Sequence, residues 1–178
     1  MYEEIIHFWF QEIDKSQRWI KNAEFDALIK RKFIDIHHQA INCELFSWRK
    51  TGLGMLAEII VLDQFSRNMY RDTPRSFAYD SLALAFAQTA VLNGHDRELT
   101  VEQRSFLYMP YMHSESPVIH IEAEALFTNL GLQHTLNFEK KHKAIIDRFG
   151  RYPHRNKILG RSSSPEELEF LSLPGSRF

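Results

Sequence analysis

Apolar residues recur at the spacing of an α-helix along nearly the whole chain, and the alternation that marks a β-strand is scarce. This pattern gives each helix an apolar stripe that has to be buried against other helices. It predicts an all-α fold that begins with a helix over about Tyr2–Phe10. A second helix is expected from near Gln17, because Trp19, Phe25 and Phe33 follow at helical spacing.

Several helix boundaries are marked by capping residues. Thr100 and Gln103 have the spacing of a capping box, and Ser164 with Glu167 repeats it. Glycines that suit a left-handed C-terminal cap end three apolar runs, at Gly94, Gly131 and Gly150. These signals predict about seven or eight helices joined by short loops.

No linker, composition shift or tandem repeat divides the chain. We therefore expect one compact domain over residues 1–178, with residues 172–178 frayed. A chain of 178 residues can bury roughly 70% of its unfolded surface, so one core is sufficient. Cys43 is the only cysteine, which excludes an intramolecular disulfide, and we interpret it as an ordinary buried thiol.

Charge and hydropathy exclude several classes of protein. The formal net charge is −1, so no overall field attracts the chain to nucleic acid or to a membrane. No stretch approaches the roughly 20 apolar residues that cross a bilayer. The N-terminal residues are acidic where a signal peptide is basic. We therefore expect a cytoplasmic protein.

The segment Gly54–Met69 combines a helix that is apolar on most sides with charged residues. Asp63 and Arg67 lie four residues apart on a core-facing stripe, where charges are costly unless they are paired. Gln64 and Asn68 are expected to form a second polar pair one step round the helix. The four side chains either form a structural ion-pair network or line a cavity.

The segment from Asp147 to Arg161 is locally basic, with five arginine or lysine residues and one aspartate. Arginine suits the bidentate capture of carboxylate or phosphate. The alternative is that these arginines cap helices and pair with structural acids. The candidate ligand-binding residues of this part of the chain are His142, Arg148, Arg151, His154, Arg155, Asn156 and Arg161.

The segment that contains His113 and Glu115 was considered as a metal site, because His120 and Glu124 beyond it have the i, i+4 spacing of helical ligands. No H-E-x-x-H motif is present, and the H-x-E run lacks the downstream P-C-x-x-C of a zinc deaminase. We therefore predict no metal and no cofactor. Glu115 is interpreted as an acid at the start of a helix.

Three runs carry a resemblance to a known family: Leu62–Asn68 (L-D-Q-F-S-R-N), His113–Glu115 (H-S-E) and Phe149–Arg161 (F-G-R-Y-P-H-R-N-K-I-L-G-R). The opening His7–Phe10 and the closing Ser164–Glu167 also fit, so the resemblance covers nearly the whole chain. The sequence resembles a bacterial family that is catalogued only as a domain of unknown function. The resemblance implies a single compact all-helical domain similar to tetratricopeptide-repeat proteins, and it supplies no activity.

The chain departs from the pattern of that family in one place. After the H-S-E motif the family tends to have an Asp-Gln pair, whereas this chain reads Ile119-His120-Ile121-Glu122. Any site that uses the Asp-Gln pair is therefore altered here.

Three hypotheses follow from these segments. The first, which leaves catalysis open, is a pocket for a small anionic or polar ligand, lined by Asp63, Gln64, Arg67, Asn68, His113, Glu115, His142, Arg148, Arg151, His154, Arg155, Asn156 and Arg161. The second is a helical module that binds a protein or peptide partner in a concave groove. The third is RNA contact through the patch from Arg148 to Arg161, which the neutral remainder of the chain disfavours. We favour the first, because mixed polar groups within apolar helices resemble a site more than a flat interface.

Overall fold

The computed structural model describes residues 1–176, and these residues form helices, turns and irregular segments without a strand. The predicted all-α class is thereby confirmed. The chain divides into two compact units. The N-terminal unit consists of residues 1–71 and 75–110, and the C-terminal unit of residues 72–74 and those from 111 on. The single domain and the tetratricopeptide-like arrangement stay predictions.

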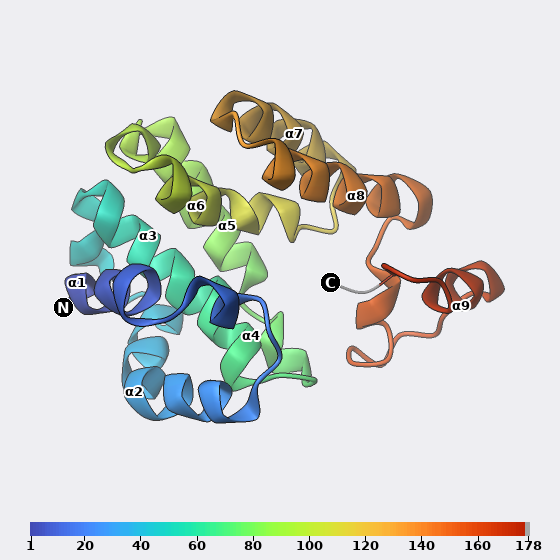
Figure 1. The fold of residues 1–178 in the computed structure, drawn as a ribbon, viewed down its shortest axis with the longest axis horizontal. Coiled ribbons are helices and arrows are strands. Elements are labelled where there is room, and N and C mark those ends of the chain that lie inside the picture. The colour runs from blue at the N-terminus through green and yellow to red at the C-terminus, as the bar shows by residue number, and fades with distance from the viewer. Residues whose placement is uncertain (177–178) are drawn as a thin grey trace. The chain divides into compact units, whose positions relative to one another are not determined.

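The N-terminal unit is built from α-helices joined by short 3-10 and π-helical pieces (Figure 1). In chain order the elements up to residue 112 are α1 (Tyr2–His7), a π-helical turn (Phe8–Glu12), a 3-10 turn (Lys15–Arg18), α2 (Ala23–Ile41), a 3-10 turn (Phe46–Lys50), α3 (Gly52–Ile60), a π-helical turn (Val61–Phe65), α4 (Ser66–Met69), a 3-10 turn (Pro74–Ser76), α5 (Asp80–Leu92), a 3-10 turn (His95–Glu98) and α6 (Val101–Met112). Pro74 and the last two residues of α6 belong to the C-terminal unit. Helix α1 packs on α3, α3 packs on α5, and α2 packs on α4.

The second helix begins later than its apolar spacing predicts. Asn22 is the N-cap of α2, and its side-chain oxygen accepts hydrogen bonds from the amides of Glu24 and Phe25. Gln17 instead belongs to a capping box with Asp14 that starts only a short 3-10 turn, which ends at Arg18. Trp19 consequently lies outside the helix, with 65% of its surface exposed.

The end of α2 also corrects a prediction. Cys43 is exposed rather than buried, and its φ of 57° lies in the left-handed region. The residue follows the C-cap Asn42, where the chain turns away from the helix axis. The residue is exposed at this turn because the apolar face of the helix has already ended, and its thiol lies near the guanidinium of Arg49.

Aromatic rings form the centre of the N-terminal unit. Phe33 lies 4.9 Å from Phe8 and 5.0 Å from Phe65 between ring centroids, and Trp9 lies 5.6 Å from Phe65. All four side chains are almost completely buried. Their edge-to-face and stacked contacts hold the first helices against the π-helical turn before α4.

The start of α3 is packed too closely for any side chain. A Cβ atom at Gly54 would lie 2.0 Å from the carbonyl oxygen of Trp48, and one at Gly52 would lie 2.4 Å from that of His95. Thr51 caps the helix by accepting a hydrogen bond from the amide of Gly54. The two glycines therefore let the helix start directly against neighbouring backbone.

The C-terminal unit contains α7 (Pro117–Leu130), α8 (Gln133–Phe149), a 3-10 turn (Pro153–Arg155) and α9 (Pro165–Leu171). Helices α7 and α8 pack together as a hairpin (Figure 1). Gly131 and Gly150 end them with φ values of 78° and 66°, as predicted for left-handed caps. The predicted capping boxes at Thr100 and Ser164 are also present.

Tyr152 anchors the segment that follows α8. Its side chain is fully buried against Ile145 and Ile146, and Phe149 and Phe170 pack on this group from α8 and α9. The apolar contacts hold the polar segment between α8 and α9 in place. Within the predicted frayed tail of residues 172–178, residues 177–178 lie outside the described part of the chain.

Candidate functional site

The predicted pair of Asp63 and Arg67 is present in the N-terminal unit. Nη1 of Arg67 donates to Oδ1 of Asp63 at 2.8 Å, and Asp63 is almost completely buried. A second carboxylate shares the same guanidinium, because Nη1 and Nη2 of Arg67 each lie 3.0 Å from an oxygen of Asp80 on α5. The ion pair thus ties the π-helical turn and α4 to α5.

Gln64 and Asn68 do not form the expected pair. Nε2 of Gln64 donates to Oδ2 of Asp63 at 2.6 Å, whereas Nδ2 of Asn68 donates to Oδ1 of Asp26 at 2.8 Å. Asp26 on α2 also binds Arg71. The two amides are therefore engaged by different carboxylates, Gln64 by one within the π-helical turn and Asn68 by one on α2.

Glu115 holds together the segment between α8 and α9. Arg161 donates to both of its carboxylate oxygens, at 2.7 and 2.9 Å, and the amide of Tyr152 donates to Oε1 at 2.8 Å. Burial raises the pKa of Glu115, but the hydrogen bonds from Arg161 and Tyr152 outweigh it and leave the pKa lowered. Nε of Arg161 also donates to Oδ1 of Asn156, which is fully buried.

Arg151 is neutralised in the same way by a carboxylate that the sequence analysis did not select. Its Nε and Nη2 donate to the two oxygens of Glu167, at 2.7 and 2.8 Å. The bonds from Arg151 lower the pKa of Glu167 to about 2. The sequence has one local signal for Glu167, because the capping box with Ser164 places this residue at the start of a helix. For Arg151 and Arg161, the alternative of structural pairing describes the geometry.

Imidazoles gather around the ring of Tyr152, and we call this group the Tyr152 cluster. It consists of Tyr152, His120, His142, His154 and Arg155. The ring of Tyr152 lies 6.3 Å from His120, 5.7 Å from His142 and 5.6 Å from His154, and the Arg155 guanidinium lies 4.8 Å from its centroid. The hydroxyl of Tyr152 donates to the Met112 carbonyl at 2.6 Å.

His120 and Glu139 form a pair that is completely buried. Nδ1 of His120 lies 2.7 Å from Oε1 of Glu139, and Nε2 lies 2.9 Å from the carbonyl oxygen of Ser114, which can only accept. Nε2 therefore carries a proton. The pair holds one further shared proton, either on His120 or on Glu139, and burial raises the pKa of Glu139. No local sequence pattern marks Glu139, and the spacing of His120 indicates only a possible metal ligand.

His142 on α8 is a buried neutral imidazole. Burial and, to a smaller extent, the nearby imidazoles of His113, His120 and His154 lower its pKa to about 3, against the hydrogen bond to Phe138, which raises it. Nδ1 donates to the carbonyl oxygen of Phe138 at 2.8 Å. This bond sets the tautomer, with the proton on Nδ1 and with Nε2 as the basic nitrogen.

The remaining predicted residues of the C-terminal unit differ in position. Nη2 of Arg155 donates to the carbonyl oxygen of His113 at 3.0 Å, which joins the H-S-E run to the Tyr152 cluster. Arg148 is exposed and lies over the ring of Phe149 at 4.6 Å. It therefore does not join the cluster. A pocket shared by the cluster and the group around Asp63 stays a prediction.

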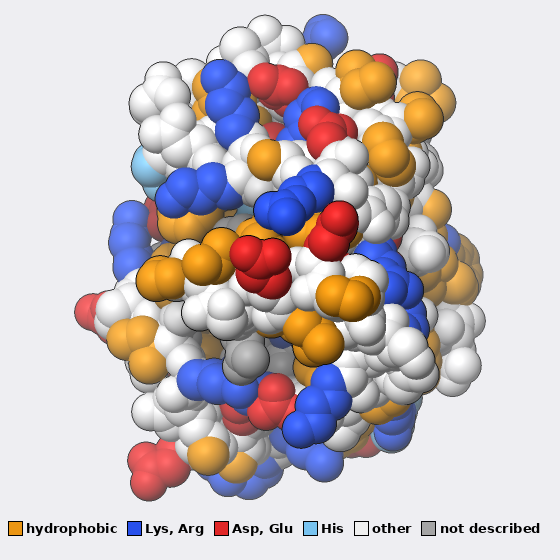
Figure 2. Space-filling model, turned by 90° about the vertical axis from the view of Figure 1, so that its right-hand side faces the viewer, with side chains coloured by type: hydrophobic (Ala, Val, Ile, Leu, Met, Phe, Trp, Pro, Cys, Tyr) orange, Lys and Arg blue, Asp and Glu red, His pale blue; other side chains and the backbone are white. Residues whose placement is uncertain are grey.

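On the face shown in Figure 2, basic and acidic side chains are interspersed. Among residues 1–176, no group of three or more histidine, cysteine or acidic residues is arranged to hold a metal ion. Within the same range, none of the helices has the length and apolar character required to cross a bilayer.

Comparison with known proteins identifies one family. A family model described as "Bacterial protein of unknown function (DUF924)" matches residues 5–175. The chain is also similar to a solved structure, that of the protein of unknown function ATU0120 from Agrobacterium tumefaciens. The two sequences are 36% identical, the match covers 96% of each chain, and the TM-score is 0.92. No curated protein matches.

Proposed function

The chain belongs to this bacterial family of unknown function, and we propose that it binds a small oxyanion with a hydroxyl group of its own at the Tyr152 cluster. Monohydrogen phosphate, phosphate monoesters and hydroxycarboxylates form this chemical class. A cytoplasmic location is part of the proposal. The gathering of His120, His142, His154 and Arg155 around the buried ring of Tyr152 is the observation that carries it.

Burying the polar side chains of the Tyr152 cluster costs free energy, which supports a role beyond holding the segment between α8 and α9 in place. His142 and Arg155 are each 6% exposed, and Tyr152 and His120 are fully buried. A polar group loses hydration when it is buried, and an apolar side chain of similar size would avoid that loss. Perturbed titratable groups gathered in this way are more frequent at functional sites than elsewhere.

His142 supplies the acceptor side of the proposed recognition. With Nδ1 donating to Phe138, Nε2 is the acceptor nitrogen of the imidazole, and the lowered pKa leaves that nitrogen unprotonated at neutral pH. A ligand that meets Nε2 must therefore donate a hydrogen bond. A fully deprotonated anion such as sulfate has no donor and is disfavoured at this position.

Arg155 supplies the donor side. A guanidinium carries five N–H donors in a planar fork that matches the geometry of an oxyanion. Arg155 lies over Tyr152, next to His154, in the same cluster as His142. A ligand that both accepts from a cation and donates to an imidazole satisfies the two sides at once.

Thermal melts with phosphate and with sulfate test the proposal. Both are tetrahedral anions of similar size, but only phosphate keeps a hydroxyl near neutral pH. We expect phosphate to raise the melting temperature of the wild type more than sulfate does, because a ligand stabilises the state that binds it. In His142→Phe the two anions should become equivalent, while His134→Phe, an exposed position on the same helix, should behave as the wild type does.

Arg155→Lys gives an independent control that keeps the charge and removes the planar fork. It should weaken the response to both anions together. Equal responses to phosphate and sulfate in the wild type would contradict the proposal, and so would an unchanged preference in His142→Phe.

A further inference from the structure

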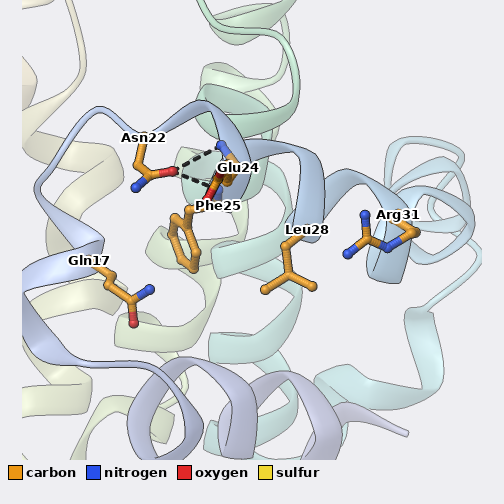
Figure 3. A pocket seen from close by; sticks show the side chains of 6 residues that line it. All are labelled: Gln17, Asn22, Glu24, Phe25, Leu28 and Arg31. Atoms are coloured by element: carbon orange, nitrogen blue, oxygen red, sulfur yellow. Dashed lines mark hydrogen bonds between the residues drawn. The ribbon is translucent and has the colours of Figure 1, made fainter.

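A hollow of about 300 Å³ lies beside the first turns of α2, in the N-terminal unit. It is lined by Gln17, Asn22, Glu24, Phe25, Leu28 and Arg31. In Figure 3 the ring of Phe25 and the methyl groups of Leu28 point to the same side, and the amide of Gln17 faces them. The volume is at the lower end of the range for sites that bind small molecules.

Both carboxamides that line the hollow have their oxygen atoms engaged. Oε1 of Gln17 accepts from the amide of Asp14 at 2.8 Å. Oδ1 of Asn22 accepts from the amides of Glu24 and Phe25 at 2.9 and 3.0 Å. Each side chain therefore presents its NH₂ group as the remaining hydrogen-bonding group, and a complementary ligand must provide carbonyl oxygens.

Opposite charges lie along the hollow, with Glu24 beside Phe25 and Arg31 at one end (Figure 3). Glu24 and Arg31 are seven residues apart on α2, which corresponds to about 10.5 Å along the helix axis. Both side chains are exposed, and neither forms an ion pair or hydrogen bond with another residue in the described range. Glu24 can therefore bind an ammonium group and Arg31 a carboxylate.

The middle of the hollow is apolar. Phe25 is 4% exposed and forms its floor, and Leu28 is partly buried one helical turn further on. An apolar side chain placed here would cover both residues. From the N-terminal end of α2, the lining thus runs from the two amide donors, past the carboxylate of Glu24 and the apolar floor, to the guanidinium of Arg31 (Figure 3).

We infer that the hollow binds a short extended peptide with free ends, about three residues long. An extended chain spans about 3.3–3.6 Å per residue, so three residues reach roughly 10 Å, similar to the separation of Glu24 and Arg31 along the helix axis. The ammonium group lies at Glu24 and the carboxylate at Arg31. The peptide carbonyls accept from Gln17 and Asn22, and the central side chain packs on Phe25 and Leu28.

The tripeptide Ala-Leu-Ala tests this inference in three forms: free, N-acetylated and C-amidated. Binding to the full chain is followed by NMR through the amide signals of residues around the hollow. We expect the free peptide to bind with a Kd on the order of 1 mM. Each capped form should bind about two- to fivefold more weakly, because exposed ion pairs contribute modestly.

Variants of Arg31 and Glu24 test which end of the peptide each of the two residues binds. In Arg31→Gln the free and amidated peptides should bind equally, and in Glu24→Gln the free and acetylated peptides should bind equally. Lys30→Gln and Asp35→Asn, exposed on the same helix, serve as matched controls and should retain the preference of the wild type. His142→Phe should have no effect, which separates this site from the Tyr152 cluster. Equal binding of all three peptides by the wild type, or no saturable shifts at the hollow, would overturn the inference.

Discussion

Arg161 binds Glu115 through two hydrogen bonds, from Nη1 to Oε2 at 2.7 Å and from Nη2 to Oε1 at 2.9 Å, although 46 residues separate them in the sequence. The same carboxylate accepts the amide of Tyr152. One acid at the end of the H-S-E run thereby fixes the position of the segment that carries the Tyr152 cluster. Glu115 therefore does more than place a negative charge at the start of a helix, since it also holds this segment in position.

Glu115→Gln should lower the free energy of unfolding by about 2 kcal/mol, since hydrogen bonds to a charged partner contribute about 1.5–3 kcal/mol. The substitution keeps an oxygen acceptor but removes the charge that faces Arg161. Urea denaturation measures the change. The exposed Glu122→Gln on α7 is the control and should change stability by less than about 0.5 kcal/mol. Equal effects of the two variants would show that the pair does not hold the segment.

The pair of Arg151 and Glu167 predicts a loss of stability in acid. The folded-state pKa of Glu167 is about 2, below its ordinary value of 4.5. Its contribution is therefore present above pH 4.5 and is lost as the pH falls toward 2. Between these values the wild type should lose more stability than Glu167→Gln, as followed by chemical denaturation at each pH. Parallel curves for the two proteins would contradict this assignment.

Two buried histidines predict a second pH dependence, at higher pH. Burial lowers the pKa of His37 to about 4 and that of His142 to about 3, whereas each is near 6.5 when unfolded. Below pH 6.5 the unfolded chain takes up protons that the folded chain does not. Each group therefore reduces stability by about 1.4 kcal/mol per pH unit as the pH falls through this window.

Replacing either histidine should flatten the dependence between pH 6 and pH 4. His37→Phe removes the group in the N-terminal unit, and His142→Phe removes the one in the C-terminal unit. The exposed His134→Phe should leave the slope unchanged. A slope that is the same in all four proteins would mean that neither buried imidazole is kept neutral.

Gly54→Ala should be among the most destabilising small substitutions in the chain. The added Cβ would lie 2.0 Å from the carbonyl oxygen of Trp48 and could be accommodated only by moving backbone. We expect a cost of about 3 kcal/mol or more. Gly131→Ala meets no atom within 4 Å and should cost only about 1–2 kcal/mol through its left-handed φ. Thermal melts that rank the two variants in the opposite order would contradict this account.

Local features of the fold could be predicted from the sequence, because the signals for them lie within one helix. The capping boxes at Thr100 and Ser164 and the glycine caps are of this kind. The predicted start of α2 is wrong because the apolar spacing continues through Trp19. The N-cap at Asn22 sets the actual start. Spacing indicates which residues could share a helix face, and the cap decides where the helix begins.

The candidate site could be predicted only in part, because its partners come from distant segments. Asp63 and Arg67 lie four residues apart, and their pairing follows from that spacing. Asp80, Glu139 and Glu167 complete ion pairs that no local spacing reveals. Carboxylates are frequent on helix surfaces, so sequence alone does not distinguish those that the fold turns inward.

NMR of the ring nitrogens of His142 tests the central claim most directly. Before ligand is added, we expect a neutral imidazole with its proton on Nδ1, and with no titration between pH 7 and about pH 4. Phosphate should then shift the Nε2 signal in the direction of hydrogen bonding, while sulfate at the same ionic strength should leave it in place. An imidazole that titrates near pH 6.5, or an Nε2 signal that neither anion moves, would contradict the account.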